Sequence, residues 1–202
     1  MEFWGPFCGC LSCERSLEVW NKERSDVPSN IALSKNASQS STYTEPGKSY
    51  SASNAVDGDR GTQDYKCTHT IRENNAWWRV DLGRVEPVAE VNIVNRNHHA
   101  NRLNGAEIRV GNETANGGAN NHLCANIIHI PAGSSKTYSC SPKAYGRYLY
   151  IRLPNMWLTL CEVEVYSYLK TETGFVGVVI GGSVSFGLNS YDTHSTTVDR
   201  VN

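Results

Sequence analysis

Residues 77–96 have the sequence WWRVDLGRVEPVAEVNIVNR. Apolar and polar residues alternate on both sides of the Glu86-Pro87 dipeptide, and β-branched and aromatic residues are frequent. This alternation is typical of strands with one buried face, and the dipeptide is typical of a turn. The stretch therefore predicts two strands, at residues 77–83 and 88–96, separated by a turn.

Further short strands are predicted on both sides of this stretch. Residues 30–44 alternate apolar and polar side chains and run into the turn sequence PGKSY. No segment shows a sustained helical period, so the chain is expected to be all-β, an antiparallel sandwich or barrel. The strands expected after residue 96 are 106–111, 127–131, 135–140, 147–154 and 160–168.

The composition excludes some classes of protein. The chain has 202 residues, 39% hydrophobic and 19% charged, with a formal net charge of −1. That length accommodates one ordinary domain with tails. Because there is no broad basic field, neither nucleic acid nor an anionic membrane surface is an expected partner.

The cysteines indicate an oxidising compartment. Four of the seven lie at long, irregular spacings, which is typical of disulfides rather than of a zinc site. The two sequons at Asn36 and Asn112 agree with secretion, although residues 1–13 do not resemble a signal peptide. Disulfide pairing, metal binding and palmitoylation all remain open for the three clustered N-terminal cysteines. These three are Cys8, Cys10 and Cys13.

Three segments are expected along the chain. Residues 1–29 form an N-terminal segment of uncertain nature, residues 30–168 form the domain, and residues 169–202 form a flexible C-terminal tail. The apolar, glycine-rich stretch within the tail is shorter than the ~20 residues of a membrane span. We therefore expect no membrane insertion.

A polar cluster lies at residues 51–70. Asn54, Asp57 and Asp59 surround a glycine in what must be a tight loop. Oxygen donors at this density suit a hard cation such as Ca²⁺, although an Asx-rich turn without a metal explains the same residues.

A second cluster, NRNHHANRLNG, lies at residues 95–105. It places Arg96 and Arg102 on one loop, with His98 and His99 between them. Arginine donors suit the hydroxyl oxygens of a neutral sugar, whereas a solvated loop is the simpler explanation. The chain contains no nucleophile elbow, no zinc-protease motif and no phosphate loop, so an enzyme is not expected.

Residues 30–168 resemble the F-type lectins, the fucolectin family typified by eel agglutinin. The motifs that carry the resemblance occur in the family's order and spacing: SNAVDGDR, CTHT, WWRVDLG, NRLNGAEI, GRYLYIRLP and LCEVEV. The resemblance implies a discoidin-like (F5/8 type C-like) jelly-roll β-sandwich. It also implies one bound calcium ion and a shallow pocket for terminal L-fucose, formed by loops at one end.

By the same resemblance, the sugar is bound by His69, Arg96 and Arg102. The family's aspartate two places after the first arginine is replaced by His98, and the segment to Arg102 is one residue shorter. In place of the family's vicinal cysteines stands His99-Ala100, so the imidazole of His99 is expected to pack on the sugar. Tyr65 is expected to form the aromatic wall near the fucose methyl group.

The resemblance further implies the calcium ligands and the disulfides. Backbone carbonyls contribute at Lys66 and Cys161, and the side chain of Glu162 completes the set with the polar loop. The implied ligands are Asn54, Asp57, Asp59, Lys66, Cys161 and Glu162, and the implied disulfides are Cys67–Cys161 and Cys124–Cys140. The ion would act as a structural clamp that does not touch the sugar.

These features predict a secreted, calcium-stabilised lectin for fucosylated glycans, serving innate recognition. Other open alternatives are a discoidin-like module for galactose-type sugars, lipid or protein, and a module of a larger protein. Lipid insertion needs exposed apolar loop tips, so the His69, Arg96 and Arg102 set favours sugar. A homo-oligomer such as a trimer is compatible with the sequence, since avidity strengthens a weak single site.

Overall fold

The computed structural model describes residues 29–167 and the backbone of two strands in residues 175–188. The described part of the chain is built from strands, loops and four short 3-10 helices. The elements up to residue 167 are β1 (Asn36–Gln39), η1 (Ala52–Ala55), η2 (Asp64–Lys66), β2 (Glu73–Val94), η3 (Ala100–Leu103), β3 (Ala106–Gly111), η4 (Ala115–Gly118), β4 (His122–Ile127), β5 (Ser135–Met156) and β6 (Glu162–Ser167).

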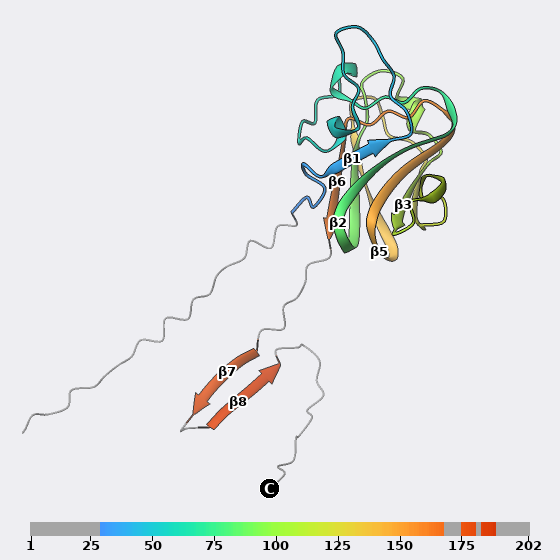
Figure 1. The fold of residues 1–202 in the computed structure, drawn as a ribbon. Helices are drawn as coiled ribbons and strands as arrows, with labels where there is room; N and C mark the ends of the chain where they lie inside the picture. The colour runs from blue at the N-terminus through green and yellow to red at the C-terminus, as the bar shows by residue number, and fades with distance from the viewer. Residues whose placement is uncertain (1–28, 168–174, 181–182, 189–202) are drawn as a thin grey trace, which may run out of the picture.

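Two long, bent strands, β2 and β5, organise the domain (Figure 1). They pair antiparallel along their whole length, in a sheet of order β1-β2-β5-β3-β4 with β6 added to β2. The first half of β2 pairs with β1 and the second half with β6, and the register shifts between Asp81 and Glu86. Such shifts bend a strand, so one hydrogen-bonded sheet folds over into two layers. The expected all-β sandwich is confirmed.

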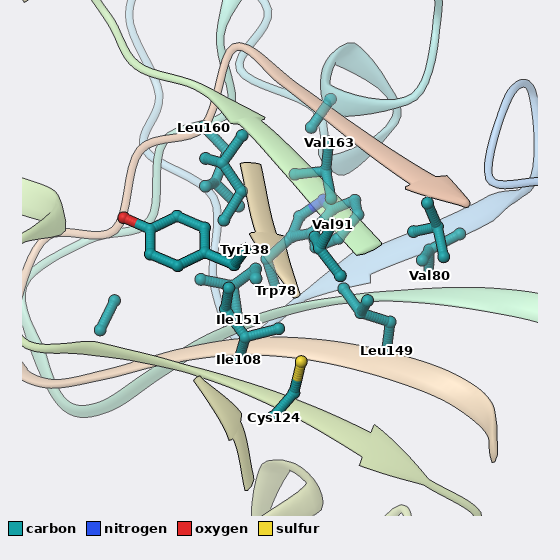
Figure 2. Close-up of a cluster of buried hydrophobic side chains, with 14 of the residues drawn as sticks. Trp78, Val80, Val91, Ile108, Cys124, Tyr138, Leu149, Ile151, Leu160 and Val163 are labelled. Carbon is teal, nitrogen blue, oxygen red and sulfur yellow. The ribbon is translucent and has the colours of Figure 1, made fainter. Parts of the chain in front are cut away.

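The core lies between the two layers. In β3, buried and partly exposed residues alternate along the whole strand, as the two-residue period of a strand requires. Trp78 from the first half of β2 and Val91 from the second half belong to the same buried cluster, together with Ile108 of β3 (Figure 2). The indole Nε1 of Trp78 donates to the carbonyl of Ala52 at 2.9 Å, so its one polar atom is satisfied.

Two sets of strand boundaries differ from the prediction. The strands expected at 77–83 and 88–96 are one element, because Glu86 and Pro87 stay in register with Gly146 and Tyr145 at the bend. The strands expected at 135–140 and 147–154 are likewise joined in β5. In each case the sequence shows the bend, but the pairing across it depends on the partner strand.

The prediction of a strand at residues 127–131 was wrong. The chain pairs with β3 earlier, in β4, and leaves the sheet after Ile127. Ile128 is 80% exposed, whereas Ile130 is fully buried, so the apolar alternation that suggested a strand belongs to an irregular segment packed on the core. Apolar periodicity alone does not distinguish these two cases.

The end of the domain at which the polar loops gather is closed by contacts between distant segments. Thr68 and Thr70 each donate a backbone N–H to a carbonyl of the 158–160 segment, and their hydroxyls accept from the amides of Leu160 and Leu158. The Cys67–Cys161 disulfide lies next to this ladder, across a sequence separation of 94. Loops at this end are therefore attached to a rigid part of the sandwich.

The second disulfide and the chain ends complete the fold. Cys124 of β4 and Cys140 of β5 are bonded, so both disulfides implied by the resemblance are present. Asn30 forms a bridge with Tyr166 of β6, which places the two ends of the described domain side by side.

The predictions for the flanking segments lie mostly outside the described residues. These include residues 1–28, with Cys8, Cys10 and Cys13, and the flexibility of the tail. Within the tail, β7 (Phe175–Ile180) and β8 (Ser183–Leu188) form a two-stranded antiparallel sheet. Among the described residues, none of the helices has the length and apolar character to cross a membrane.

Candidate functional site

A cavity of about 350 Å³ lies among the loops that join the strands of the domain. Segments far apart in sequence meet there: the loops before β2, the loop after β2 and the end of β5. The lining residues are Tyr43, Glu45, Tyr50, Asp64, His69, Arg96, His99, Arg102 and Trp157. Four of these, His69, Arg96, His99 and Arg102, are residues that the sequence assigned to sugar binding, and the structure brings them together.

His69 is fixed by a hydrogen bond on each ring nitrogen. Its Nδ1 is 2.7 Å from the carbonyl of Thr70, which can only accept, so Nδ1 carries the proton. Its Nε2 is 2.9 Å from Nη1 of Arg102, which can only donate, so Nε2 is an acceptor. The geometry therefore selects the neutral ring with a lone pair directed toward Arg102.

The surroundings of His69 favour this neutral form. Burial lowers the pKa of the imidazole below its ordinary value of 6.5, and the positive charges of Arg102 and Arg96 lower it further. The hydrogen bond to the Thr70 carbonyl acts in the opposite direction. Because burial is the largest of these causes, His69 is held uncharged at neutral pH.

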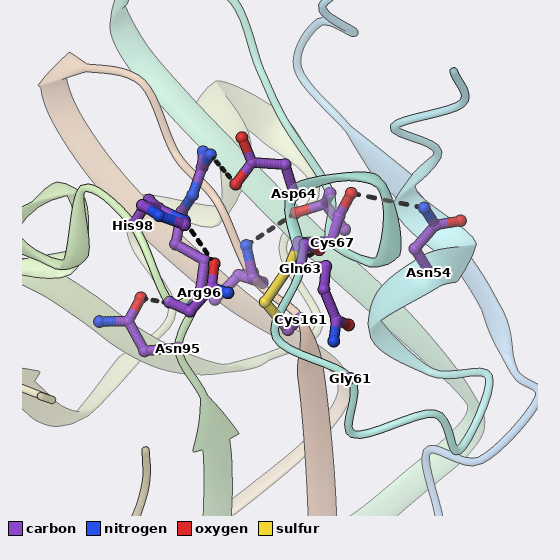
Figure 3. The surroundings of a disulfide bond; sticks show 12 residues. Asn54, Gly61, Gln63, Asp64, Cys67, Asn95, Arg96, His98 and Cys161 are labelled. Carbon is purple, nitrogen blue, oxygen red and sulfur yellow. Dashed lines mark hydrogen bonds and ion pairs between the residues drawn. A yellow bond between two sulfur atoms is a disulfide. The ribbon is translucent and has the colours of Figure 1, made fainter. Parts of the chain in front are cut away.

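Arg96 is almost completely buried, with 3% of its surface exposed. Its guanidinium forms an ion pair through Nη2 with the carboxylate of Asp64 on η2 (Figure 3). The amide side chain of Asn95 donates to the carbonyls of Ala100 and Ile130, which fixes the start of the same loop. Buried charges need such partners, so the position of Arg96 is set by its surroundings before any ligand arrives.

The carboxylate that pairs with Arg96 comes from an unexpected place. The aspartate that the family has on the arginine loop is replaced by His98, whose ring bonds to Asn97 instead. Asp64 supplies the counter-charge from a loop more than thirty positions earlier. Nothing in the local sequence of the arginine loop indicated this pairing.

Arg102 lies in η3 and faces both His69 and an aromatic ring. Its guanidinium carbon is 4.9 Å from the centre of the Trp157 ring. Burial, followed by the positive charge of Arg96, lowers the pKa of Arg102 from its ordinary value, although the side chain stays protonated. Two arginines thus present donors to the same space, and the lone pair of the neutral His69 ring orients one of them.

Aromatic rings form the remaining walls, and they are not the ring that was expected. Tyr43 lies 4.8 Å from the His69 ring and Tyr50 lies 5.5 Å from it, measured between ring centres. Tyr65 does not line the cavity, because it lies on η2 with 53% of its surface exposed. Tyr43, Tyr50 and Trp157 were missed because each comes from a loop with no motif of its own.

The residues expected to bind calcium lie beside the Cys67–Cys161 disulfide. The backbone N–H of Gly58 donates to Oε1 of Glu162 at 3.2 Å, and the amide of Asn54 contacts the carbonyl of Cys67. Asp59 forms an ion pair of 2.5 Å with Lys66. Within residues 29–167, no group of three or more acidic, histidine or cysteine side chains is arranged so that it could hold a metal ion. Half of the expected calcium ligands, however, are backbone carbonyl or side-chain amide oxygens, and these atoms do not belong to acidic, histidine or cysteine side chains.

Glu162 provides the test of whether a cation fits. Its carboxylate is fully buried, and Oε2 has no hydrogen-bond partner. Its pKa is raised from 4.5 to about 7, chiefly by burial and also by the neighbouring charge of Asp57, while the hydrogen bond from Gly58 acts in the opposite direction. A buried carboxylate with an unpartnered oxygen is stabilised by a cation, so the residues present fit Ca²⁺.

The sequence and the fold were compared with known proteins. The family model described as NedA-like, galactose-binding domain matches residues 54–151. The fucolectin of Anguilla anguilla is 40% identical over 141 residues, which is 67% of this chain and 89% of that protein.

Two solved structures extend the comparison. The crystal structure of an F-lectin (fucolectin) from striped bass serum, Morone saxatilis, has a TM-score of 0.66 at 42% identity over 70% of this chain. This chain spans only 50% of that one. The lectin domain of lectinolysin in complex with Lewis b antigen has a TM-score of 0.53 at 35% identity, and it covers 69% of this chain and 96% of that chain.

A discoidin-like β-sandwich with a basic, aromatic-walled cavity among its loops defines a class of carbohydrate-binding modules. The relatives just described are lectins and a lectin domain. The chain belongs to the F-type lectin, or fucolectin, family.

Proposed function

We propose that this chain is a lectin that binds terminal L-fucose in the cavity lined by His69, Arg96 and Arg102. The observation that carries the proposal is the convergence of these three side chains, in fixed orientations, between aromatic walls. The names of the relatives, fucolectin above all, support the same ligand. Nothing in this arrangement calls for a chemical step, so we propose binding without catalysis.

The cavity suits a deoxy sugar with an axial hydroxyl. The N–H groups of Arg96 and Arg102 can donate to ring and hydroxyl oxygens, and a sugar hydroxyl can donate to Nε2 of His69 where it displaces the Arg102 N–H from that nitrogen. A sugar in which that hydroxyl is equatorial would leave these protein groups unpaired, at a cost of about 1–3 kcal/mol each. The methyl group of fucose would lie against an aromatic wall, where burial of apolar surface is favourable.

Calcium is proposed as a structural ion at the loop that contains Asn54, Asp57 and Asp59. Glu162 would contribute its side chain, and Lys66 and Cys161 their carbonyl oxygens. When bound, the ion would neutralise the buried charge of Glu162 and tie the polar loop to β6. The sugar would still be held by protein side chains alone, since none of these residues lines the cavity.

Titration calorimetry of the full chain with L-fucose tests the proposal. We expect wild-type protein to bind L-fucose, and the Arg102→Gln variant to lose about tenfold or more in affinity, since charge-assisted donors contribute most to such sites. Lys35→Gln removes the same charge outside the cavity and should bind as wild type does. A folded wild-type protein that ignores L-fucose would overturn the proposal.

A second candidate is a galactose-type sugar. It is favoured by the family model, whose description names a galactose-binding domain. D-galactose also has an axial 4-hydroxyl, but it has the opposite configurational series from L-fucose and carries a hydroxymethyl group where L-fucose carries a methyl group, so it offers no apolar methyl to the aromatic wall. The same calorimeter run with D-galactose decides between the two, and we expect the weaker binding there.

We propose further that the lectin is extracellular and serves in recognition of glycan-coated surfaces. The two disulfides support an oxidising compartment. A shallow single site is weak, and several copies in one particle would strengthen attachment by avidity. A trimer is the proposed state, so sedimentation equilibrium should give three times the 22.3 kDa of one chain. A monomer mass at all concentrations would refute it.

A further inference from the structure

Trp157 extends the cavity outward and is accompanied by two guanidinium groups. Arg102 lies on the cavity side, with its guanidinium carbon 4.9 Å from the ring centre. Arg72 lies over the same ring at 5.6 Å but does not line the cavity. The indole is half-buried and Arg72 is exposed, so both side chains are accessible beside the cavity.

The positions of Arg72 and Trp157 are set by the ladder that also fixes His69. Thr70 exchanges backbone and side-chain hydrogen bonds with Leu158, the residue after Trp157. On the other side, Glu73 pairs with Met156 in the β2–β5 ladder. Arg72 and Trp157 are thus enclosed between two paired positions, and their approach is a property of the backbone.

The carboxylates near this surface are already occupied by other donors. Glu45 accepts from Lys48 and Tyr50, each at 2.8 Å. Asp64 pairs with Arg96, and Glu73 accepts from two serine hydroxyls. Among the residues that the structure describes, no salt bridge links Arg72 or Arg102 to a carboxylate. Among the described residues, the two guanidinium groups beside Trp157 therefore have no carboxylate at ion-pair distance, and Asp64 acts on Arg102 only from farther away.

From this arrangement we infer a second subsite, formed by Arg72, Trp157 and the outer edge of Arg102, for an anionic group on the sugar next to fucose. A guanidinium that lies over an indole ring keeps its in-plane N–H groups free. These donors match the paired oxygens of a carboxylate or a sulfate. The inference rests on the proposed function, because fucose in the cavity brings the neighbouring sugar to Trp157.

The shared chemistry of the ligand is a fixed negative charge on a fucosylated oligosaccharide. A sulfate ester and the carboxylate of a sialic acid both supply it. A neutral oligosaccharide would bind through fucose alone, whereas an anionic one would gain charge-assisted hydrogen bonds at the half-exposed Trp157 surface. We expect a gain of about three- to tenfold in affinity, as for a partly solvated interaction of this kind.

Calorimetry of the full chain with four ligands tests the inference. The ligands are L-fucose, a neutral fucosylated trisaccharide, the same trisaccharide with a sulfate ester on its galactose, and the same trisaccharide with a sialic acid on its galactose. Wild type is compared with Arg72→Gln, and Lys35→Gln serves as a control that loses the same charge elsewhere. All titrations are repeated at raised salt, which weakens exposed charge interactions.

We expect wild type to prefer at least one anionic ligand over the neutral trisaccharide, and which one it prefers identifies the source of the charge. Arg72→Gln should remove this preference and leave the affinity for L-fucose unchanged, while Lys35→Gln keeps both. Equal affinity for all three oligosaccharides, or a preference that survives in Arg72→Gln, would overturn the subsite alone. A wild type that fails to bind L-fucose would overturn the proposed function and the subsite together.

Discussion

At the scale of single residues, the site depends on the protonation state and orientation of His69. The Thr70 carbonyl fixes the proton on Nδ1, and Arg102 requires a lone pair on Nε2. A protonated ring would lose that lone pair and bring a third positive charge beside Arg96 and Arg102. The acceptor function of His69 therefore exists only in the neutral form.

This dependence predicts how binding responds to pH. The ordinary pKa of 6.5 is lowered in the folded protein, first by burial and then by the two arginines. The unfolded chain thus binds the proton more readily, and the stability contributed by neutral His69 is present above pH 6.5 and lost as the pH falls below it. Because the folded protein binds the sugar, we expect L-fucose affinity to stay constant through pH 6.5 and to decline only at the lower pH at which folded His69 takes up a proton.

Calorimetry across a pH series measures the effect, with circular dichroism to show that the protein remains folded at each pH. An affinity that rises as the solution becomes more acidic would contradict the assignment of Nε2 as an acceptor.

At the scale of elements, the loops depend on their attachment to the last strands. The Cys67–Cys161 disulfide links η2 to β6 across a separation of 94, while Cys124–Cys140 links neighbouring strands across 16. In the chain-entropy model these loops correspond to about 4.7 and about 3 kcal/mol of stabilisation. The longer link is also the one that lies next to His69.

Removing each disulfide in turn separates the two contributions. We expect Cys67→Ala/Cys161→Ala to lower the free energy of unfolding by more than Cys124→Ala/Cys140→Ala does, because it releases the larger loop. Urea denaturation of both double variants measures the difference. L-fucose affinity should also fall in the first variant. If the second variant lost more free energy of unfolding than the first, the Cys67–Cys161 disulfide would not be the more stabilising of the two.

The proposed calcium ion acts on the same pair of elements. Glu162 is buried with one carboxylate oxygen unpartnered, so Ca²⁺ should raise the free energy of unfolding, by about 2.7 kcal/mol at a concentration one hundred times its Kd. Glu162→Gln should abolish this response.

Thermal denaturation with calcium or with a chelator measures the response, and Glu164→Gln is the matched control. Glu164 lies on the same strand but forms its ion pair with Arg60 at 2.5 Å. Calcium stabilisation that persists in Glu162→Gln would place the ion elsewhere.

At the scale of the whole molecule, the sequence predicted the class of fold and the chemistry of the site but not its complete outline. The short alternating strands along residues 30–168 predicted an all-β sandwich or barrel, and the resemblance to the F-type lectins assigned His69, Arg96 and Arg102 to the site. The continuity of β2 and of β5 across their bends could not be predicted, because it depends on pairing with a distant strand.

The parts of the cavity that the sequence did not predict also depend on contacts between distant segments. Asp64 pairs with Arg96 from another loop, and Trp157 reaches Arg102 from the end of β5. Residues far apart in sequence make these contacts, so no local sequence pattern predicts them. Tyr65 was expected from the resemblance, whereas the fold leaves it on η2 with 53% of its surface exposed and outside the cavity.

The most direct measurement of the central claim is a crystal structure of the chain grown with L-fucose. The account predicts a sugar among the loops at the end of the sandwich, with one hydroxyl within hydrogen-bond distance of His69, Arg96 and Arg102 and its methyl group against an aromatic wall. A cavity that stays empty at saturating L-fucose, or a sugar bound on another surface, would contradict it.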